Sequence, residues 1–471
     1  MFDREKGDQQ MYGGMIALII LVLLLVALFA LAIYRLALLR HGGTAAIIRT
    51  GSRRDSLGWR HGLIRYGEST FEFYKLSSAR LGPDVRADRQ AISVVGRRAP
   101  TAGESDIMDP DIAVLEIQND GRMWELALER GALTAFLLTV PFVNLVAPGD
   151  KVIVCRNGVF GGRMIENVER CGGVPIVVEA AWGEPIDPNK LEEALKANPD
   201  VRVVAFIHAE TSTGVQSDAK TLIEVAHKYD ALTIVDTVTS LAGSPVLVDE
   251  WQLDAVYSAS QKCLSCTPGL SPVSFSERVV EHVKARKDKI HSWFMDMNLL
   301  LGYWGATTRT YHHTAPTNSL YALHEALVIM KEEGIENAWA RHLRHHLALK
   351  AGLEAMGLKL LVKEGARLPQ MNAVIVPEAI GAKEAEVRKR LLSEFNLEIG
   401  AGLGPLAGKI WRIGLMGYSC KPENVMLCLS ALGSVLSDMD LPIHVGDAEA
   451  AAHGAYASLH TKAAQQKKRA A

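Results

Sequence analysis

A carboxylate and a lysine each follow an apolar segment with the composition of a buried strand. Asp236 ends the segment LTIVD, and Lys262 comes 26 residues later, just after the segment DAVYSAS. In a doubly wound parallel sheet such strand ends face the ligand crevice. The pair suits pyridoxal phosphate, because a lysine can hold this cofactor as a Schiff base while a carboxylate keeps the pyridine nitrogen protonated. An ordinary buried ion pair between Asp236 and Lys262 is the alternative.

The elements that must position these residues alternate along the chain. Short apolar segments are separated by helical ones such as GRMIENVERCG and DAKTLIEVAHKYD; the apolar segments include KVIVCRNGV, VPIVVEA and VRVVAFIHAE. This alternation is typical of βαβ units, with a parallel sheet covered by helices on both faces. We therefore predict a large α/β domain over residues 141–320.

The pattern changes after residue 320. A long helical segment, SLYALHEALVIMKEEG, precedes three short strand-like segments and the helical segment PENVMLCLSALGSVLSDM. These elements predict a helix and a small α+β domain over residues 321–446. The Ala-rich end, residues 447–471, is predicted to be a disordered tail.

Composition excludes several classes of protein. The 471 residues are 48% hydrophobic and 22% charged, so the chain can bury roughly three cores at about 150 residues each. Its net charge of -2 disfavours a nucleic-acid binder. Six scattered cysteines are too few for a disulfide scaffold in a chain of this length, which fits a reducing, cytosolic compartment.

One segment departs from this globular composition. Residues 15–34 read MIALIILVLLLVALFALAIY, without a charge, and about twenty apolar residues suffice to span a bilayer core as a helix. We predict an uncleaved transmembrane helix over residues 11–35. More basic residues follow it than precede it, so the N-terminus is expected outside the cell membrane and the C-terminal domains in the cytoplasm.

A β-rich module is predicted between this span and the α/β domain, over residues 43–140. Its strand-like segments include IAVLEIQ and RMWELALE, which flank Asn119-Asp120-Gly121, a strong hairpin signal. A short helical segment, GALTAFLLTV, closes the module. Residues 35–100 carry thirteen Lys/Arg against five Asp/Glu, an excess that either attracts anionic lipid headgroups or simply sets topology and solvation.

The first 140 residues resemble a small family of uncharacterised, membrane-anchored proteins of actinobacteria. The segments that carry the resemblance are the span, GWRHGLIRYGESTFEFYKLSSARLGPD, VGRRAP and DIMDPDIAVLEIQNDGRMWELALERGALTAFL. The resemblance implies no activity.

A second resemblance covers about residues 143–440. Its segments are HAETSTGV, DTVTSLAGSPV, YSASQKCLSCTPGLSPVSFS, RTYHHTAPTNSLYALHEAL and LGPLAGKIWRIGLMG. In this order they resemble the class V aminotransferases, nearest to the alanine/serine–glyoxylate aminotransferase group. The resemblance implies the fold type I architecture and transfer of an amino group from serine or alanine to glyoxylate or a similar 2-oxo acid. It also implies a homodimer with shared active sites.

The resemblance further implies roles for single residues. It makes Lys262 the Schiff-base lysine and proton shuttle, and Asp236 the partner of the pyridinium. The remaining cofactor contacts that it implies are Phe160 and Val238 on the ring faces, Thr211 near the phenolic oxygen, Gln261 at the phosphate, and Tyr311 and Thr314 at the phosphate of the neighbouring subunit. Phe160 and Val238 have core packing as their alternative, and Thr211 a helix cap.

Arg412 is the implied substrate residue. Its planar guanidinium suits bidentate binding of a carboxylate, with a structural salt bridge as the alternative. No metal site is expected.

The resemblance breaks at its start. Family members hold the cofactor phosphate with a Ser-Gly-His or similar turn at a helix N-terminus, which ungapped extension from Val143 places on Leu133, Thr134 and Ala135. Only Thr134 offers a hydroxyl there, and Pro141 interrupts the helix that should follow. The turn is therefore expected to be missing and the aminotransferase part to be truncated at its N-terminal side. Two hypotheses follow: a membrane-tethered transaminase, or a non-catalytic fusion or gene-model chimera that carries an inactive one.

Overall fold

The computed structural model describes residues 44–50, 58–66, 70–76, 78, 80, 82–88, 92–98, 101, 104, 112–119, 122–129, 139–290, 292–304 and 310–470. The chain divides into two compact units, Met1–Leu133 and Thr134–Ala471. The predicted span over residues 11–35 lies outside the described residues. None of the helices in the described ranges is long and apolar enough to cross a membrane.

Unit 1 is an antiparallel sheet. Its strands are β1 (Thr44–Thr50), β2 (Arg60–Tyr66), β3 (Thr70–Lys75), β4 (Val85–Asp88), β5 (Ile92–Arg98), β6 (Ile112–Asn119) and β7 (Arg122–Glu129). They lie in the order β4-β3-β2-β1-β7-β6-β5, so β1 and β7, the first and last strands along the chain, are neighbours. Ile48, Phe73 and Ile117 are in its buried core.

The predicted hairpin of unit 1 is confirmed. Strands β6 and β7 pair with Asn119 opposite Arg122, which leaves the two residues Asp120 and Gly121 between them. Most of the helix predicted over residues 131–140 lies outside the described residues.

Unit 2 begins with the predicted large α/β domain. The main strands of this domain are β8 (Lys151–Arg156), β9 (Val174–Glu179), β10 (Val203–Ile207), β13 (Leu232–Asp236), β14 (Ala255–Tyr257) and β15 (Val273–Phe275). They form a sheet in the order β15-β14-β13-β10-β8-β9. Every pairing is parallel except that of β14 with β15, which agrees with the prediction of a mainly parallel sheet.

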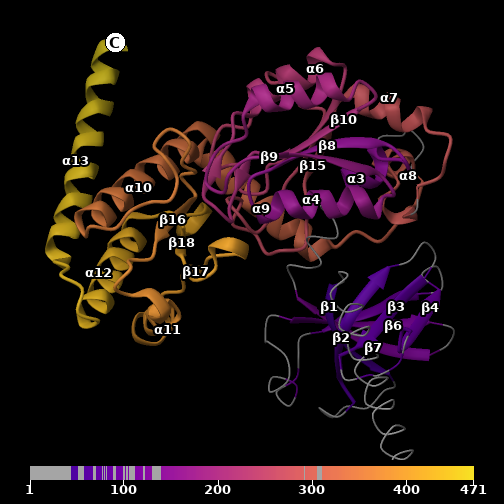
Figure 1. Ribbon diagram of the computed structural model, residues 1–471, viewed down its shortest axis with the longest axis horizontal. Coiled ribbons are helices and arrows are strands. Elements are labelled where there is room, and N and C mark those ends of the chain that lie inside the picture. Colours follow the sequence, from indigo (N-terminus) through magenta and orange to yellow (C-terminus); the bar gives the residue numbers. More distant parts are fainter. Residues whose placement is uncertain are drawn as a thin grey trace, which may run out of the picture. The chain divides into compact units, whose positions relative to one another are not determined.

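Helices cover both faces of this sheet (Figure 1). One face packs on α3 (Val140–Leu145), α4 (Val159–Arg170), α7 (Glu277–Ala285) and α8 (Met297–Trp304). The other packs on α5 (Pro188–Ala197) and α6 (Ala219–Lys228). Successive residues of β8 alternate between the two cores, Val152 facing one and Ile153 the other. This burial on both faces explains why the strands are uninterrupted apolar segments.

The small domain follows the long helix α9 (Thr317–Glu333). Its sheet has the order β16-β18-β17 and comprises β16 (Met371–Ile375), β17 (Gly400–Ala401) and β18 (Ile410–Gly414). It packs on α10 (Ile335–Ala355), α11 (Glu384–Phe395) and α12 (Pro422–Asp438). The fully buried Trp411 is the largest side chain of this core.

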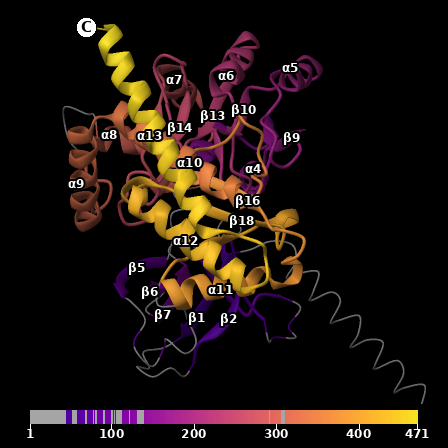
Figure 2. The same cartoon turned by 90° about the vertical axis from the view of Figure 1, so that its left-hand side faces the viewer.

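The prediction of a disordered tail over residues 447–471 is wrong. Helix α13 (Val445–Ala470) lies along α10 and α12 (Figure 2). Ala448 and Ala452, one helical turn apart, are fully buried, and the Tyr456 hydroxyl is 2.8 Å from His345 Nδ1 on α10. Alanine has the highest helix propensity, and its small side chain lets α13 approach α10 closely.

Candidate active site

The carboxyl ends of the parallel strands bring the predicted residues together. Asp236, the last residue of β13, lies opposite Ile207 of β10 and Tyr257 of β14. Its Oδ1 accepts a 2.8 Å hydrogen bond from the Val238 N–H, and the Tyr257 side chain also hydrogen-bonds to it. Burial raises the pKa of Asp236 to about 7, and the neighbouring Glu210 carboxylate adds to this rise.

Lys262 lies in the turn that follows β14. Burial lowers the pKa of its amine, and the positive charge of Arg412 lowers it further. Asp236 and Lys262 are near enough for each charge to shift the pKa of the other, yet no ion pair or hydrogen bond joins these two described side chains. The ordinary ion-pair alternative is therefore not the arrangement in the structure.

Arg412 reaches this group from the small domain. It lies on β18, where its Nε donates to the Ala401 carbonyl at 2.7 Å and its Nη1 to the Thr211 carbonyl at 3.3 Å. No carboxylate of the described chain forms a salt bridge with it, so the salt-bridge alternative is not observed. The geometry leaves a half-buried cation beside Lys262 and Thr211.

Thr211 lies in the turn between β11 (Ala209–Glu210) and β12 (Val215–Gln216) and is buried. The turn does not start a helix, so the helix-cap alternative for Thr211 does not apply.

The two residues predicted at the ring faces are half-buried. Phe160 is in the first turn of α4 with the Arg163 guanidinium 5.0 Å from its ring centre, and Val238 follows Asp236. Both also pack on the core beneath the sheet, so core packing and a ligand contact are compatible for them.

Tyr311 and Thr314 are not part of this group within one chain. They lie on the segment between α8 and α9, where the Tyr311 hydroxyl is 2.9 Å from Thr314 Oγ1. The Tyr311 side chain is 77% exposed. Residues that contact a cofactor in a neighbouring subunit would need such exposed hydroxyl groups.

A carboxylate that sequence reasoning did not single out is also at this edge of the sheet. Glu210 follows β10 by three residues and has no exposed surface. Its position after a wholly buried apolar strand is the same signal that identified Asp236. Burial lowers the pKa of Arg412, and the Glu210 charge acts against this shift. Burial raises the pKa of Asp236, and the Glu210 charge adds to that rise.

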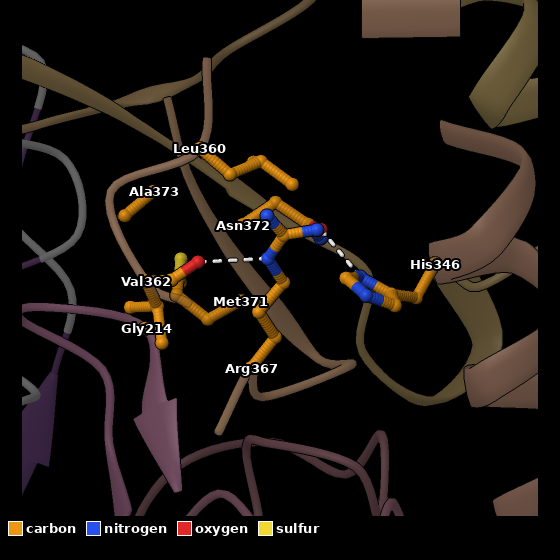
Figure 3. Close-up of a pocket in the computed structure, with 8 residues that line it drawn as sticks. All are labelled: Gly214, His346, Leu360, Val362, Arg367, Met371, Asn372 and Ala373. Atoms are coloured by element: carbon orange, nitrogen blue, oxygen red, sulfur yellow. Dashed lines mark hydrogen bonds between the residues drawn. The ribbon is translucent and has the colours of Figure 1, made fainter. Parts of the chain in front are cut away.

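A small cavity lies beside Gly214, and most of its lining is apolar (Figure 3). Its polar lining residues are Arg367, His346 and Asn372, with His346 Nδ1 2.6 Å from Asn372 Oδ1 and Arg367 Nε donating to the Val362 carbonyl at 2.8 Å. Its volume is about 10 Å³, close to the minimum for one water molecule. It is too small for an amino-acid substrate.

A model of the family "Aminotransferase class-V" matches residues 130–416. The chain belongs to the class V aminotransferases. A second model, "Protein of unknown function (DUF2550)", matches residues 21–138, so the two matches overlap over residues 130–138.

Relatives in this family are more than a third identical to this aminotransferase over the aligned residues. (S)-ureidoglycine–glyoxylate transaminase of Bacillus subtilis (strain 168) is 36% identical, over 81% of this chain and 96% of the relative. Alanine–glyoxylate aminotransferase of Callithrix jacchus is 37% identical, over 64% of this chain and 72% of the relative.

Solved structures show the same fold type I architecture. Alanine–glyoxylate aminotransferase of Nostoc sp. superposes with a TM-score of 0.62 and 41% identity, over 64% of this chain and 79% of that chain. The corresponding values for ureidoglycine–glyoxylate aminotransferase of Bacillus subtilis are 0.66 and 39%, over 69% and 82%.

Class V aminotransferases are pyridoxal-phosphate-dependent, and the residues present fit this cofactor. Asp236 is a buried carboxylate that could pair with a pyridinium, and Lys262 is a half-buried amine. Gln261 has a buried side-chain oxygen without a hydrogen-bond partner, and rotation of its amide would present a donor to a phosphate instead. Residues 133–135, where the family's phosphate-binding turn would fall and is expected to be missing, lie outside the described residues.

Proposed function

We propose that this chain is a transaminase that moves an amino group from a small amino acid to glyoxylate or a similar 2-oxo acid. The observation that carries the proposal is the convergence of Asp236, Lys262 and Arg412 at the carboxyl edge of one sheet. Glyoxylate is the acceptor named in both relatives described above. Their donors differ, and alanine or serine is the donor that we propose here.

Each residue of the group has a chemical task in this proposal. When bound, pyridoxal phosphate supplies an electron sink for the carbon that loses its proton. Asp236 holds a proton on the pyridine nitrogen, and a positive ring nitrogen would lower the pKa of this carboxylate from about 7. Lys262 takes the proton from Cα of the amino acid, a task helped by a lowered amine pKa. Arg412 binds the substrate carboxylate and thereby fixes the Cα–H bond toward Lys262.

A homodimer belongs to the same proposal. Large apolar side chains are exposed on α8 and α9 and on the 3-10 helix η2 (Trp293–Met295), and none of the 17 residues of α9 is buried. The exposed side chains of this apolar surface include Trp293, Trp304, Leu320, Tyr321, Leu327 and Ile329. Tyr311 and Thr314 are next to it in sequence, so a second copy covering the surface would receive their hydroxyls at its own cofactor site.

Covalent trapping tests the proposal directly. Borohydride reduction of the purified protein with pyridoxal phosphate, followed by peptide mapping, should find a pyridoxyl group on Lys262. The Lys262→Ala variant is the control and should show none at this peptide. A folded wild-type protein without pyridoxyl-lysine at position 262 would favour the non-catalytic alternative.

Donor identity needs a separate assay. Glycine formation from glyoxylate with alanine, serine or ureidoglycine ranks the donors by kcat/KM. No glycine with any of the three donors would reject the glyoxylate transaminase, even if the cofactor binds.

A further inference from the structure

The Glu210 carboxylate accepts four hydrogen bonds from two separate segments of the large domain. Its Oε2 accepts from the N–H groups of Phe160 at 3.1 Å and Gly161 at 3.3 Å, in the first turn of α4. Its Oε1 accepts from the N–H and the hydroxyl of Ser212 at 3.0 and 2.6 Å. The side chain therefore ties the start of α4 to the turn that contains Thr211.

This link is closely packed. Ser212 Oγ accepts a further hydrogen bond from the Val159 N–H at 2.9 Å, so the first three N–H groups of α4 all end on Glu210 and Ser212. A Cβ at Gly158 would lie 2.4 Å from the Glu210 side chain and 2.4 Å from Ser212 Oγ. Glycine at position 158 is what leaves room for the carboxylate.

The contacts suit a carboxylate better than an amide. Three of the four donors are backbone N–H groups, which cannot accept, so the NH₂ group of an amide would direct an N–H toward one of them. Burial raises the pKa of Glu210, whereas the hydrogen bonds from Ser212, Gly161 and Phe160 lower it. The N-terminal end of α4 also favours a negative charge.

A helix cap with no link to the site is the simpler interpretation of these contacts. The position of the two joined segments argues against this interpretation, because each of them carries a residue of the proposed site. Phe160 is at the start of α4, and the Thr211 carbonyl accepts a hydrogen bond from Arg412 at 3.3 Å. Displacement of Glu210 would therefore move both Phe160 and the carbonyl that orients Arg412.

We propose that Glu210 is a positioning residue of the cofactor site, which fixes Phe160 relative to Thr211 and Arg412. This inference rests on the proposed function, because it takes Phe160 as a residue that packs on the cofactor ring. Glu210 itself need not contact the cofactor or the substrate.

The substitution that tests this is Glu210→Gln, which keeps the length of the side chain and removes its charge. Its matched control is Glu384→Gln, a buried glutamate in the first turn of α11 that pairs with Arg388 at 2.6 Å. Three quantities are measured: the Kd for pyridoxal phosphate, the visible circular dichroism of the bound cofactor at saturation, and hydrogen exchange of residues 159–162 without cofactor.

Glu210→Gln is expected to raise the Kd about ten- to a hundredfold, as the loss of hydrogen bonds to a buried charge predicts. It should also change the circular dichroism band, which reports ring orientation, and speed exchange at residues 159–162. Glu384→Gln should leave all three quantities as in the wild type. A folded Glu210→Gln protein with wild-type Kd and dichroism would overturn the proposal and leave Glu210 a simple cap.

A milder variant covers the case in which Glu210→Gln does not fold. Ser212→Ala removes one donor to Glu210 and the acceptor for Val159, so it should shift the same three quantities in the same direction by less. Wild-type values for Ser212→Ala in all three would overturn the proposal. If wild-type protein binds no pyridoxal phosphate, the proposed function fails, and unchanged hydrogen exchange in Glu210→Gln would still reject the link separately.

Discussion

Acidification from pH 7 to pH 5 is expected to weaken the contact between helix α10 and the segment beside Lys262, through protonation of His342. His342 Nδ1–H donates to the Ala338 carbonyl at 2.7 Å, and its Nε2 accepts the Gly417 N–H at 2.9 Å. The second bond requires the neutral ring, because a protonated Nε2 cannot accept a hydrogen bond. The next residue, Tyr418, donates its N–H to Ser265 Oγ at 2.6 Å, three residues after Lys262.

The size of the effect follows from the pKa of His342. Burial lowers this pKa to about 4 in the folded protein; Arg341 lowers it slightly, while the Ala338 carbonyl and Glu333 act in the opposite direction. The unfolded chain has a pKa of about 6.5, so it binds the proton first, and stability is lost as the pH falls from 6.5 toward 4. At pH 5 the loss is about 2 kcal/mol relative to pH 7.

Other groups titrate in the same interval, so the variant must be compared with the wild type at both pH values. Burial also lowers the pKa of His208 to about 4, which adds a similar loss. Asp236 acts in the opposite sense without cofactor, because its raised pKa of about 7 makes protonation favour the folded state. Only the part of the pH dependence of stability that is lost in His342→Gln is due to this residue.

The assay is urea denaturation of the wild type and His342→Gln at pH 7 and pH 5. The difference in free energy of unfolding between the two pH values should be smaller by about 2 kcal/mol in His342→Gln. The exposed His453 on α13 provides the control His453→Gln, which should behave as the wild type. An equal pH dependence in wild type and His342→Gln would refute the assignment of this proton to His342.

Three further changes test the packing and the roles of single residues. Gly158→Ala should lower the free energy of unfolding by about 1–3 kcal/mol, because its Cβ would lie 2.4 Å from Glu210 and Ser212 atoms. Gly162→Ala on the same helix, where a Cβ meets nothing within 4 Å, should raise it by up to about 1 kcal/mol in the same urea assay. Equal effects would contradict the close packing at Gly158. Phe160→Ala should raise the Kd for pyridoxal phosphate roughly two- to tenfold in equilibrium dialysis, and Phe160→Trp should not; a wild-type Kd for both would leave Phe160 a core residue. Arg412→Lys should raise KM for the 2-oxo acid about ten- to a hundredfold with little change in the cofactor spectrum, since lysine lacks the bidentate fork. An unchanged KM would remove Arg412 from the substrate site.

The large sheet could be predicted because its strands are buried on both faces. Such strands must be apolar throughout, as Val203–Ile207 of β10 are, and the rule that ligands bind at strand ends then points to Asp236 and Lys262. The same rule applied to β10 would have found Glu210. It was missed because the polar residues after β10 were included in the strand-like segment VRVVAFIHAE.

Contacts with distant segments could not be predicted. The burial of Ala448 and Ala452 depends on α10, about a hundred residues earlier, and composition alone cannot distinguish an Ala-rich helix that packs from one that does not. The hydrogen bond between His342 and Gly417 has no sequence signal either. Both histidine nitrogens are satisfied only after two elements of the small domain meet.

The site depends on the small domain at two points, and both are polar contacts to backbone atoms. Arg412 of β18 donates to the Thr211 carbonyl, and the Tyr418 N–H donates to Ser265 Oγ in the turn after Lys262. Glu210 fixes the turn that contains Thr211 from within the large domain, whereas His342 on α10 fixes the segment that contains Gly417. Loss of either anchor should therefore affect a different side of the site. Glu210→Gln should alter the ring orientation of the cofactor, and protonation of His342 should alter the position of Lys262, so the two changes should combine additively in cofactor affinity.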